Sequence, residues 1–141
     1  MIVGVDLDHT LTDAAWRDEH IEACKASGKW DPYHSLAIQD KPTSIVPLVI
    51  ALIFDGHEVY IVTARPRKWL RQTHSWLHTN GIIVDQDHIL MRAQDSFLPA
   101  PEIKLELIAN IKLDLFIDDR DDVIAAMGEL GITTLQARVA T

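Results

Sequence analysis

Four short apolar runs alternate with helical patterns along the chain, and this alternation constrains the fold more than any other feature. The runs are MIVGVD, HEVYIVTA, LDLFIDD and GITTLQA, and the first three are rich in β-branched or aromatic residues and end in polar residues. Strands that alternate with helices pair in parallel, and the helices then cover both faces of the sheet. The sequence therefore predicts an α/β fold with a mostly parallel sheet of four buried strands.

Helical patterns occupy the stretches between these runs. They are TSIVPLVIALIFDGH, RPRKWLRQTHSWLHTNG, APEIKLELIANIK and DDVIAAMGELG. The stretch 12–41 differs, because it is polar and contains a helical AAWRDEHIEACKAS and an aromatic KWDPYH. We therefore predict that residues 1–141 form a single domain, and that residues 12–41 are a small insertion after the first strand, above the carboxyl edge of the sheet.

Composition limits the classes of partner. The formal net charge of −8 argues against extended binding to duplex nucleic acid, which requires a basic face. The sequence has no apolar stretch of membrane length and no charged leader, so we expect neither membrane spanning nor secretion. The single cysteine, Cys24, fits a reducing compartment, and a cytoplasmic location is predicted. Nothing in the sequence implies an obligate protein partner.

Polar residues lie where three of the predicted strands end. They are Asp6 and Asp8, then Thr63 and Arg65, then Asp118 and Asp119. Ligands of open parallel sheets bind beyond the carboxyl ends of the strands, near the point where the strand order reverses. We therefore expect these side chains to converge at one edge of the sheet.

The converging groups predict a metal-assisted phosphoryl site. Several carboxylates at one edge would repel each other, and Mg2+, which prefers oxygen ligands, would offset this repulsion. Thr63 offers a hydroxyl, Lys104 an ammonium group and Arg65 a bidentate guanidinium for phosphoryl oxygens. A metal, cationic side chains and a further carboxylate are what phosphoryl transfer through an aspartyl-phosphate requires.

Four motifs resemble those of the haloacid dehalogenase (HAD) superfamily of phosphatases, in the same order. They are DLDHT, VTAR, the lysine of EIKLE and IDDRDD. The resemblance covers nearly the whole chain and is greatest to the phage-type branch related to the 3'-phosphatase domain of polynucleotide kinase-phosphatase. It implies a HAD-like Rossmannoid fold, a three-layer α/β/α sandwich in which residues 12–41 form a small cap.

The same resemblance implies roles for individual residues. Asp6 corresponds to the nucleophile and Asp8 to the general acid that later acts as general base. Thr63 and Lys104 correspond to the groups that hold the transferring phosphoryl oxygens, and Arg65 to a residue that contacts the substrate. The implied Mg2+ ligands are the carboxylate of Asp6, the backbone carbonyl of Asp8, and Asp118, with Asp119 as a second ligand or close neighbour.

The favoured function is therefore a Mg2+-dependent phosphomonoesterase for a small phosphorylated substrate of nucleotide type. The sequence leaves open whether this is a nucleoside monophosphate or a 3'-phosphate nucleic-acid end. A receiver-type signalling module is an alternative, but its acceptor aspartate would lie in mid-chain. A non-catalytic nucleotide-binding protein is a third hypothesis.

Several residues keep two interpretations at this stage. Trp16, Trp30 and Tyr33 could stack on a base or pack within a small lid. Lys104 lies on a helix near acidic residues, where an exposed lysine is the ordinary case. His9 stands where most members of the resembled family have glycine, and we expect it to adjust the turn or line the site.

Overall fold

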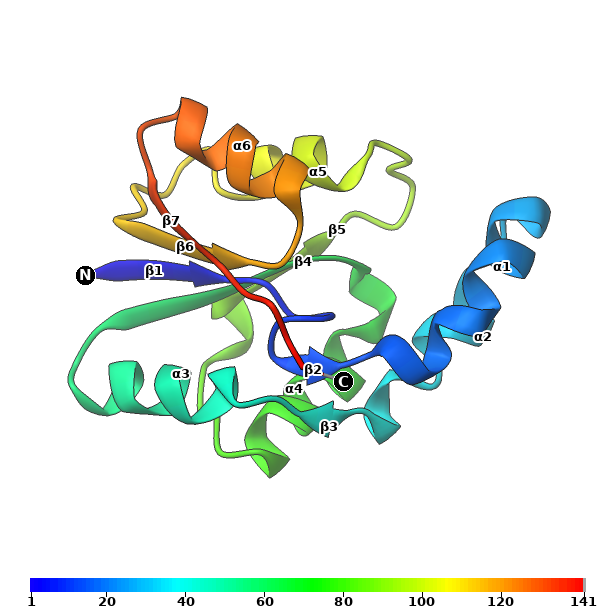
Figure 1. The fold of residues 1–141 in the computed structure, drawn as a ribbon, viewed down its shortest axis with the longest axis horizontal. Coiled ribbons are helices and arrows are strands. Elements are labelled where there is room, and N and C mark those ends of the chain that lie inside the picture. The colour runs from blue at the N-terminus through cyan, green and yellow to red at the C-terminus, as the bar shows by residue number, and fades with distance from the viewer. Residues whose placement is uncertain (141) are drawn as a thin grey trace.

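A five-stranded, fully parallel sheet lies at the centre of the computed structural model, which describes residues 1–140 (Figure 1). The strand order is β5-β4-β1-β6-β7. The bounds are β1 Ile2–Val5, β4 Glu58–Pro66, β5 Ile89–Arg92, β6 Leu115–Asp118 and β7 Thr133–Gln136. The predicted α/β class and parallel sheet are confirmed.

The chain runs from β1 outward to β4 and β5 on one side, and then returns to add β6 and β7 on the other side of β1. Strand β1 therefore lies at the point where the order of the strands reverses. Val5 pairs with Ile61 of β4 on one side and with Ile117 of β6 on the other. The backbone N–H of Asp6 continues this register, because it donates to the carbonyl of Ile117 at 2.8 Å. The residues that follow β1 therefore lie between the carboxyl ends of two neighbouring strands, where ligands of such sheets bind.

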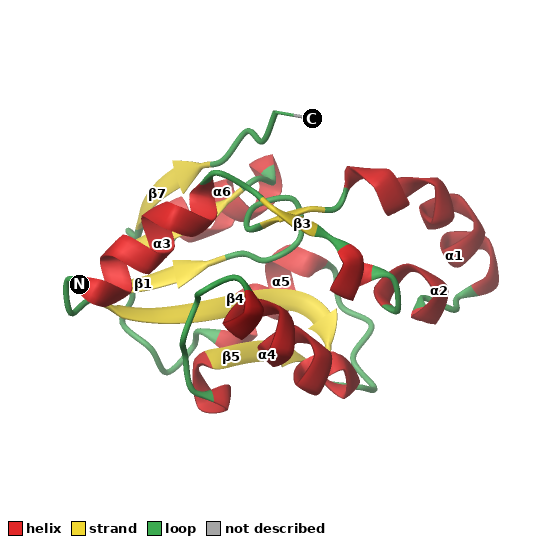
Figure 2. Ribbon diagram, turned by 90° about the horizontal axis from the view of Figure 1, so that it is seen from below, coloured by secondary structure: helices red, strands yellow, loops and turns green. Residues whose placement is uncertain are grey.

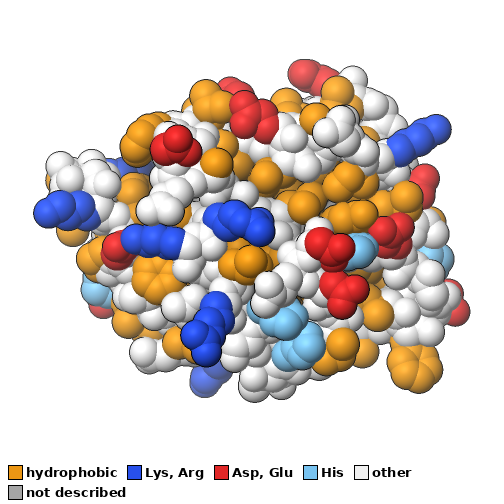
Figure 3. Space-filling view, turned by 180° about the vertical axis from the view of Figure 1, so that it is seen from behind, with side chains coloured by type: hydrophobic (Ala, Val, Ile, Leu, Met, Phe, Trp, Pro, Cys, Tyr) orange, Lys and Arg blue, Asp and Glu red, His pale blue; other side chains and the backbone are white. Residues whose placement is uncertain are grey.

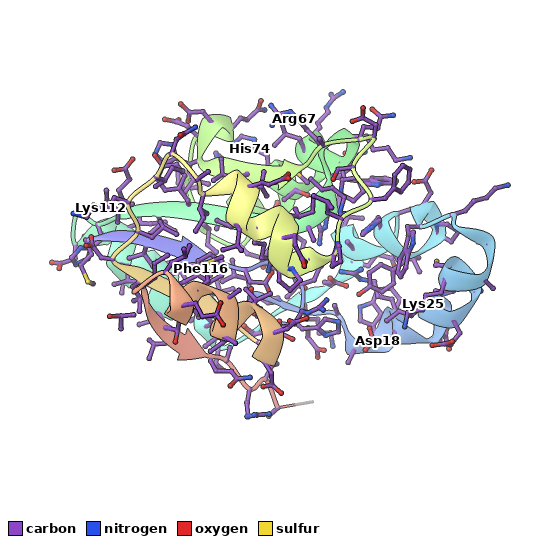
Figure 4. All side chains as sticks on the ribbon, turned by 90° about the horizontal axis from the view of Figure 1, so that it is seen from above. Asp18, Lys25, Arg67, His74, Lys112 and Phe116 are labelled. Carbon is purple, nitrogen blue, oxygen red and sulfur yellow. The ribbon has the colours of Figure 1, made fainter. Side chains whose placement is uncertain are left out.

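Helices cover both faces of the sheet (Figures 1 and 2). Helices α3 (Ile45–Phe54) and α4 (Leu70–Thr79) lie on one face, and α5 (Ala100–Leu107) and α6 (Asp121–Glu129) lie on the other. Val3 and Val5 pack in the core with residues of α3 and α4. Phe116, labelled in Figure 4, packs with residues of α6 on the opposite face. The result is the predicted three-layer sandwich.

Gly4 allows the side chains of Phe116 and Leu113 to lie close against β1. A Cβ atom at Gly4 would lie 2.6 Å from the ring of Phe116 and 2.9 Å from the side chain of Leu113. Carbon atoms in contact normally stay about 3.5–4 Å apart, so any side chain here would force the core to move. The glycine within the first strand is therefore a packing requirement.

The stretch between β2 (Thr12–Asp13) and β3 (Lys41–Pro42) projects from one end of the molecule (Figure 2). It contains 3₁₀ helix η1 (Ala15–His20), α1 (Ile21–Ser27), α2 (Asp31–His34) and 3₁₀ helix η2 (Ala37–Gln39). Strands β2 and β3 pair antiparallel, so the chain leaves and returns at one place. In Figure 4, Asp18 and Lys25 lie on this projection and Lys112 lies at the opposite end of the molecule.

Three details differ from the sequence prediction. Strand β5 was not predicted, and β7, which was predicted to be buried, is an edge strand whose residues are mostly exposed. The single helix predicted within residues 14–27 is divided into η1 and α1. Two further 3₁₀ helices lie in connections of the sheet: η3 (Arg67–Trp69) precedes α4, and η4 (Gln86–His88) precedes β5. None of the described helices is long and apolar enough to cross a membrane.

Candidate active site

Two buried carboxylates and one buried lysine meet at the carboxyl edge of the sheet. Asp6 follows β1, Asp118 ends β6, and Lys104 comes from α5; each is 4% exposed or less. The Nζ atom of Lys104 donates to Asp6 Oδ1 at 2.7 Å and to Asp118 Oδ2 at 2.5 Å. Burial lowers the pKa of Lys104, but the two carboxylates outweigh it and the net shift is upward. Lys104 is therefore a permanently charged group on the floor of the site, and not an exposed lysine.

A third carboxylate, that of Asp119, lies beside those of Asp6 and Asp118. Carboxylate oxygens of Asp6, Asp118 and Asp119 all lie within 4.8 Å of one another. Burial raises the pKa of Asp118 to about 6, and the charge of Asp6 adds to the shift. Burial also raises the pKa of Asp119 to about 8, together with its hydrogen bond to Asp6 and the charge of Asp6. The one nearby lysine does not offset the negative charge of all three groups.

These three carboxylates fit a hard divalent cation. Such a cation takes oxygen ligands, and its charge would offset the repulsion that raises the two pKa values. Thr10, which is fully buried, donates its hydroxyl to Asp6 Oδ2 at 2.9 Å and lies 3.4 Å from Asp119 Oδ1. The threonine of the first motif thus binds one carboxylate oxygen of Asp6, and Lys104 binds the other.

Thr63 lies near the carboxyl end of β4 and is 1% exposed. Its hydroxyl oxygen accepts the backbone N–H of Arg65 at 3.1 Å. The hydroxyl proton has no acceptor among the described residues and can be donated to a ligand. Thr63, Asp6 and Lys104 all line one cleft of about 730 Å³, so the structure brings these predicted residues together.

Asp8 is held between two arginines. Arg65 Nη2 and Arg17 Nη2 each lie 2.5 Å from Asp8 Oδ1, and Arg65 Nη1 also donates to Thr73 at 2.9 Å. Burial raises the pKa of Asp8, but the charges and hydrogen bonds of Arg65 and Arg17 outweigh it and lower the pKa far below its ordinary value. In this arrangement Asp8 is ionised. The prediction that Arg65 contacts substrate stays a prediction, and the structure places its guanidinium in the cleft beside Asp8.

Arg17 is the site residue that sequence reasoning missed. It comes from η1, is fully buried, and makes three hydrogen bonds to Asp40, of which the shortest is 2.7 Å. Its guanidinium carbon lies 4.3 Å from the centre of the Tyr33 ring. Asp40 also accepts the indole N–H of Trp16 at 2.8 Å. Nothing in the spacing of these residues signals the contact, because an arginine in a polar stretch is ordinarily exposed.

His9 adopts φ 64°, the one positive φ of a non-glycine residue in the described part of the chain. This left-handed conformation is the one that the usual glycine would adopt easily. The ring Nε2 of His9 lies 3.3 Å from Asp18 Oδ1 and 3.4 Å from the Tyr33 hydroxyl. His9 lines the cleft, so it both shapes the turn and joins the first motif to the projecting segment.

Comparison with known proteins identifies the fold. No protein-family model matches the chain. A Bacillus cereus protein named "Putative nucleotidase" is 36% identical over 132 residues, which span 89% of this chain and 65% of that protein. The structure of the Pnkp1/Rnl/Hen1 RNA repair complex contains a chain that matches 96% of this one with a TM-score of 0.79 at 24% identity.

A second solved structure carries the family name. It is a HAD family enzyme from Bacteroides thetaiotaomicron in complex with magnesium and inorganic phosphate, with a TM-score of 0.57 over 99% of this chain and 95% of that one, at 14% identity. The chain has the HAD fold. The HAD-like fold that the four motifs imply is thus confirmed. The chain spans 65% of the B. cereus relative and 42% of the repair-complex chain.

Proposed function

We propose that this HAD-fold chain is a Mg2+-dependent phosphomonoesterase that acts on nucleotide-type substrates through an aspartyl-phosphate at Asp6. The observation that carries the proposal is the convergence of Asp6, Lys104 and Asp119 in the lining of one cleft, with the buried Asp118 beside them and oxygens of the three carboxylates within 4.8 Å. The name of the B. cereus relative supports the nucleotide class.

The first half of the reaction breaks the phosphate ester. An Asp6 carboxylate oxygen attacks phosphorus, the bond from phosphorus to the leaving oxygen breaks, and that oxygen takes a proton from Asp8. Thr63 donates its free hydroxyl proton to a phosphoryl oxygen, and Lys104 compensates negative charge there. Mg2+, held by Asp6, Asp118, Asp119 and the backbone carbonyl of Asp8, would supply Lewis-acid stabilisation of that charge.

The second half regenerates the enzyme. Water attacks phosphorus of the aspartyl-phosphate, Asp8 accepts the proton, and the bond to Asp6 breaks to release inorganic phosphate. Asp8 must therefore carry a proton in one step and accept one in the next.

The two arginines explain how the protonation of Asp8 responds to substrate. Without a ligand, Arg17 and Arg65 keep Asp8 ionised. A phosphate that draws the Arg65 guanidinium toward itself weakens one of these two ion pairs. Burial then raises the pKa of Asp8 toward that of a proton donor. Arg65 would thus bind the substrate phosphate and also control the protonation of Asp8.

We further propose that residues 12–41 form a small cap on a single domain of residues 1–141. Strands β2 and β3 confine the segment to one attachment, Tyr33 of the segment lines the cleft, and Arg17 of the segment binds Asp8. A small cap leaves room for a bulky leaving group, such as a nucleoside. The cytoplasmic location stays a prediction.

Release of inorganic phosphate tests the proposed function. Purified protein is assayed against nucleoside 5'- and 3'-monophosphates and 3'-phosphorylated oligonucleotides, with Mg2+ and with a chelator. We expect turnover that requires Mg2+ and is lost in Asp6→Asn, with Asp55→Asn, an exposed aspartate on the far side of the fold, as the matched control. Full activity in the chelated sample would contradict the metal requirement.

A further inference from the structure

The cleft contains two chemically different groups of residues. Buried members of the lining, among them Asp6, Thr63 and Lys104, are charged or polar and form the floor. Its exposed members include large apolar side chains, of which Phe97 is 92% exposed and Leu98 is 41% exposed. Because exposed lining residues lie at the mouth, a ligand with its phosphate on the floor would place its leaving group against this apolar rim.

Phe97 is presented on a loop that is held in place. The loop joins β5 to α5, and Arg92 at the end of β5 binds its backbone. Arg92 donates to the carbonyl of Leu98 at 2.5 Å, to that of Ser96 at 3.4 Å, and to Ala64 of β4 at 2.8 Å. The chain on either side of Phe97 is therefore tied to the sheet while its ring faces solvent. An aromatic ring kept exposed by a fixed loop is available to a ligand.

Trp30 supplies a second aromatic surface from the projecting segment. Its ring meets the buried Tyr33 edge-on, with 5.9 Å between the ring centres, and His34 lies close by at 6.3 Å. These contacts fix the ring and leave Trp30 half-buried in the cleft lining. Trp16 is different, because its indole donates to Asp40 and it does not line the cleft. Of the two tryptophans considered from sequence, Trp30 is the one placed to meet a ligand.

The charges around these rings favour an anionic ligand of limited size. Lys25 and Arg92 line the same cleft, as does Lys68, which is paired with Asp31 at 2.5 Å. Lys and Arg side chains gather mainly on the half of one face nearest α1 and α2, among hydrophobic side chains (Figure 3). A volume of about 730 Å³ is that of a small-molecule site. The net charge of −8 disfavours a polynucleotide.

We propose that Phe97 and Trp30 recognise the base of a nucleoside monophosphate whose phosphate lies at Asp6. The proposal rests on the proposed function and names the substrate class of that same site. Every base has a π face, so stacking on these rings would select nucleotides over sugar phosphates without strong preference among bases. The leaving group is then a free nucleoside and not the end of a polynucleotide.

The test compares two substrates that share the ribose phosphate and of which only one carries a base. It measures kcat/KM for a nucleoside 5'-monophosphate and for ribose 5-phosphate, in wild type, Phe97→Ala, Phe97→Tyr and Trp30→Ala. The ratio of the two values should fall by about 5- to 100-fold in Phe97→Ala and Trp30→Ala, from the usual strength of base stacking. Phe97→Tyr should retain it, and so should Phe54→Ala, whose ring is 91% exposed on α3 outside the cleft.

Three outcomes would overturn the inference and leave the proposed function intact. They are an equal ratio in wild type and Phe97→Ala, ribose 5-phosphate turned over as well as the nucleotide by wild type, and preference for a 3'-phosphorylated oligonucleotide. If no substrate is hydrolysed, the proposed function fails, and calorimetric titration with the nucleoside monophosphate decides the base site. Weaker binding by Phe97→Ala than by Phe54→Ala supports it, and equal binding refutes it.

Discussion

Replacing Arg17 by leucine should destabilise the protein more than any exposed substitution, because it leaves the buried carboxylate of Asp40 without its arginine partner. Arg17 is fully buried and Asp40 is 5% exposed. Loss of the guanidinium removes three hydrogen bonds to Asp40 and one to Asp8. Removal of one member of a buried ion pair costs about 3–5 kcal/mol. With a urea m-value of about 2 kcal/mol/M, the unfolding midpoint should fall by roughly 2 M.

The assay is urea unfolding followed by circular dichroism, with Arg138→Leu as the control. Arg138 is exposed, and its nearest carboxylate, Asp121, lies 3.9 Å away, so its loss should change stability by less than about 0.5 kcal/mol. The double variant Arg17→Leu/Asp40→Leu should recover part of the loss, because it removes the uncompensated charge of Asp40. A loss below about 1 kcal/mol in Arg17→Leu would refute the buried network.

Three further predictions concern packing, pH and metal. Gly4→Ala should cost about 1–3 kcal/mol in urea unfolding, since its Cβ would meet Phe116; an unchanged midpoint would contradict the close packing of the Phe116 ring against β1. Burial lowers the pKa of His34 from 6.5 to about 4, so the unfolded chain binds more protons between these values. Stability should therefore fall by about 2 kcal/mol from pH 7 to pH 5, and less in His34→Gln; equal pH dependence of the two proteins would exclude His34 as the cause. Mg2+ should raise the Tm of wild type and raise that of Asp119→Asn much less, and equal shifts would place the ion elsewhere.

Sequence patterns predicted the sheet well because its inner strands are continuous apolar runs that end in polar residues. Strand β5 was not predicted because Ile89–Arg92 has one β-branched residue and no aromatic residue, and a short apolar run of this kind cannot be distinguished from a turn of helix. GITTLQA forms the predicted strand β7 at an edge, where one neighbour is missing and most of its residues are exposed. The sequence thus predicted that this strand exists, whereas its position in the sheet depends on tertiary contacts.

The candidate site was predictable where its residues follow strands. The convergence of Asp6, Thr63 and Asp118 follows from the parallel sheet alone, since all three lie at carboxyl ends of neighbouring strands. Lys104 required the motif order, because its local sequence resembles an exposed helix face. Arg17 and Phe97 lie in a helical segment and a loop whose positions over the cleft depend on the whole fold, so no local pattern reveals them.

The most direct test of the account is chemical trapping of the phosphoenzyme at Asp6. Wild-type protein is mixed with Mg2+ and a nucleoside monophosphate, quenched in acid and analysed by peptide mass spectrometry. The account predicts a mass increase of one phosphoryl group on the N-terminal peptide at Asp6, absent in Asp6→Asn and in the chelated sample. A turnover-competent protein with no label on that peptide, or with the label on another residue, would contradict it.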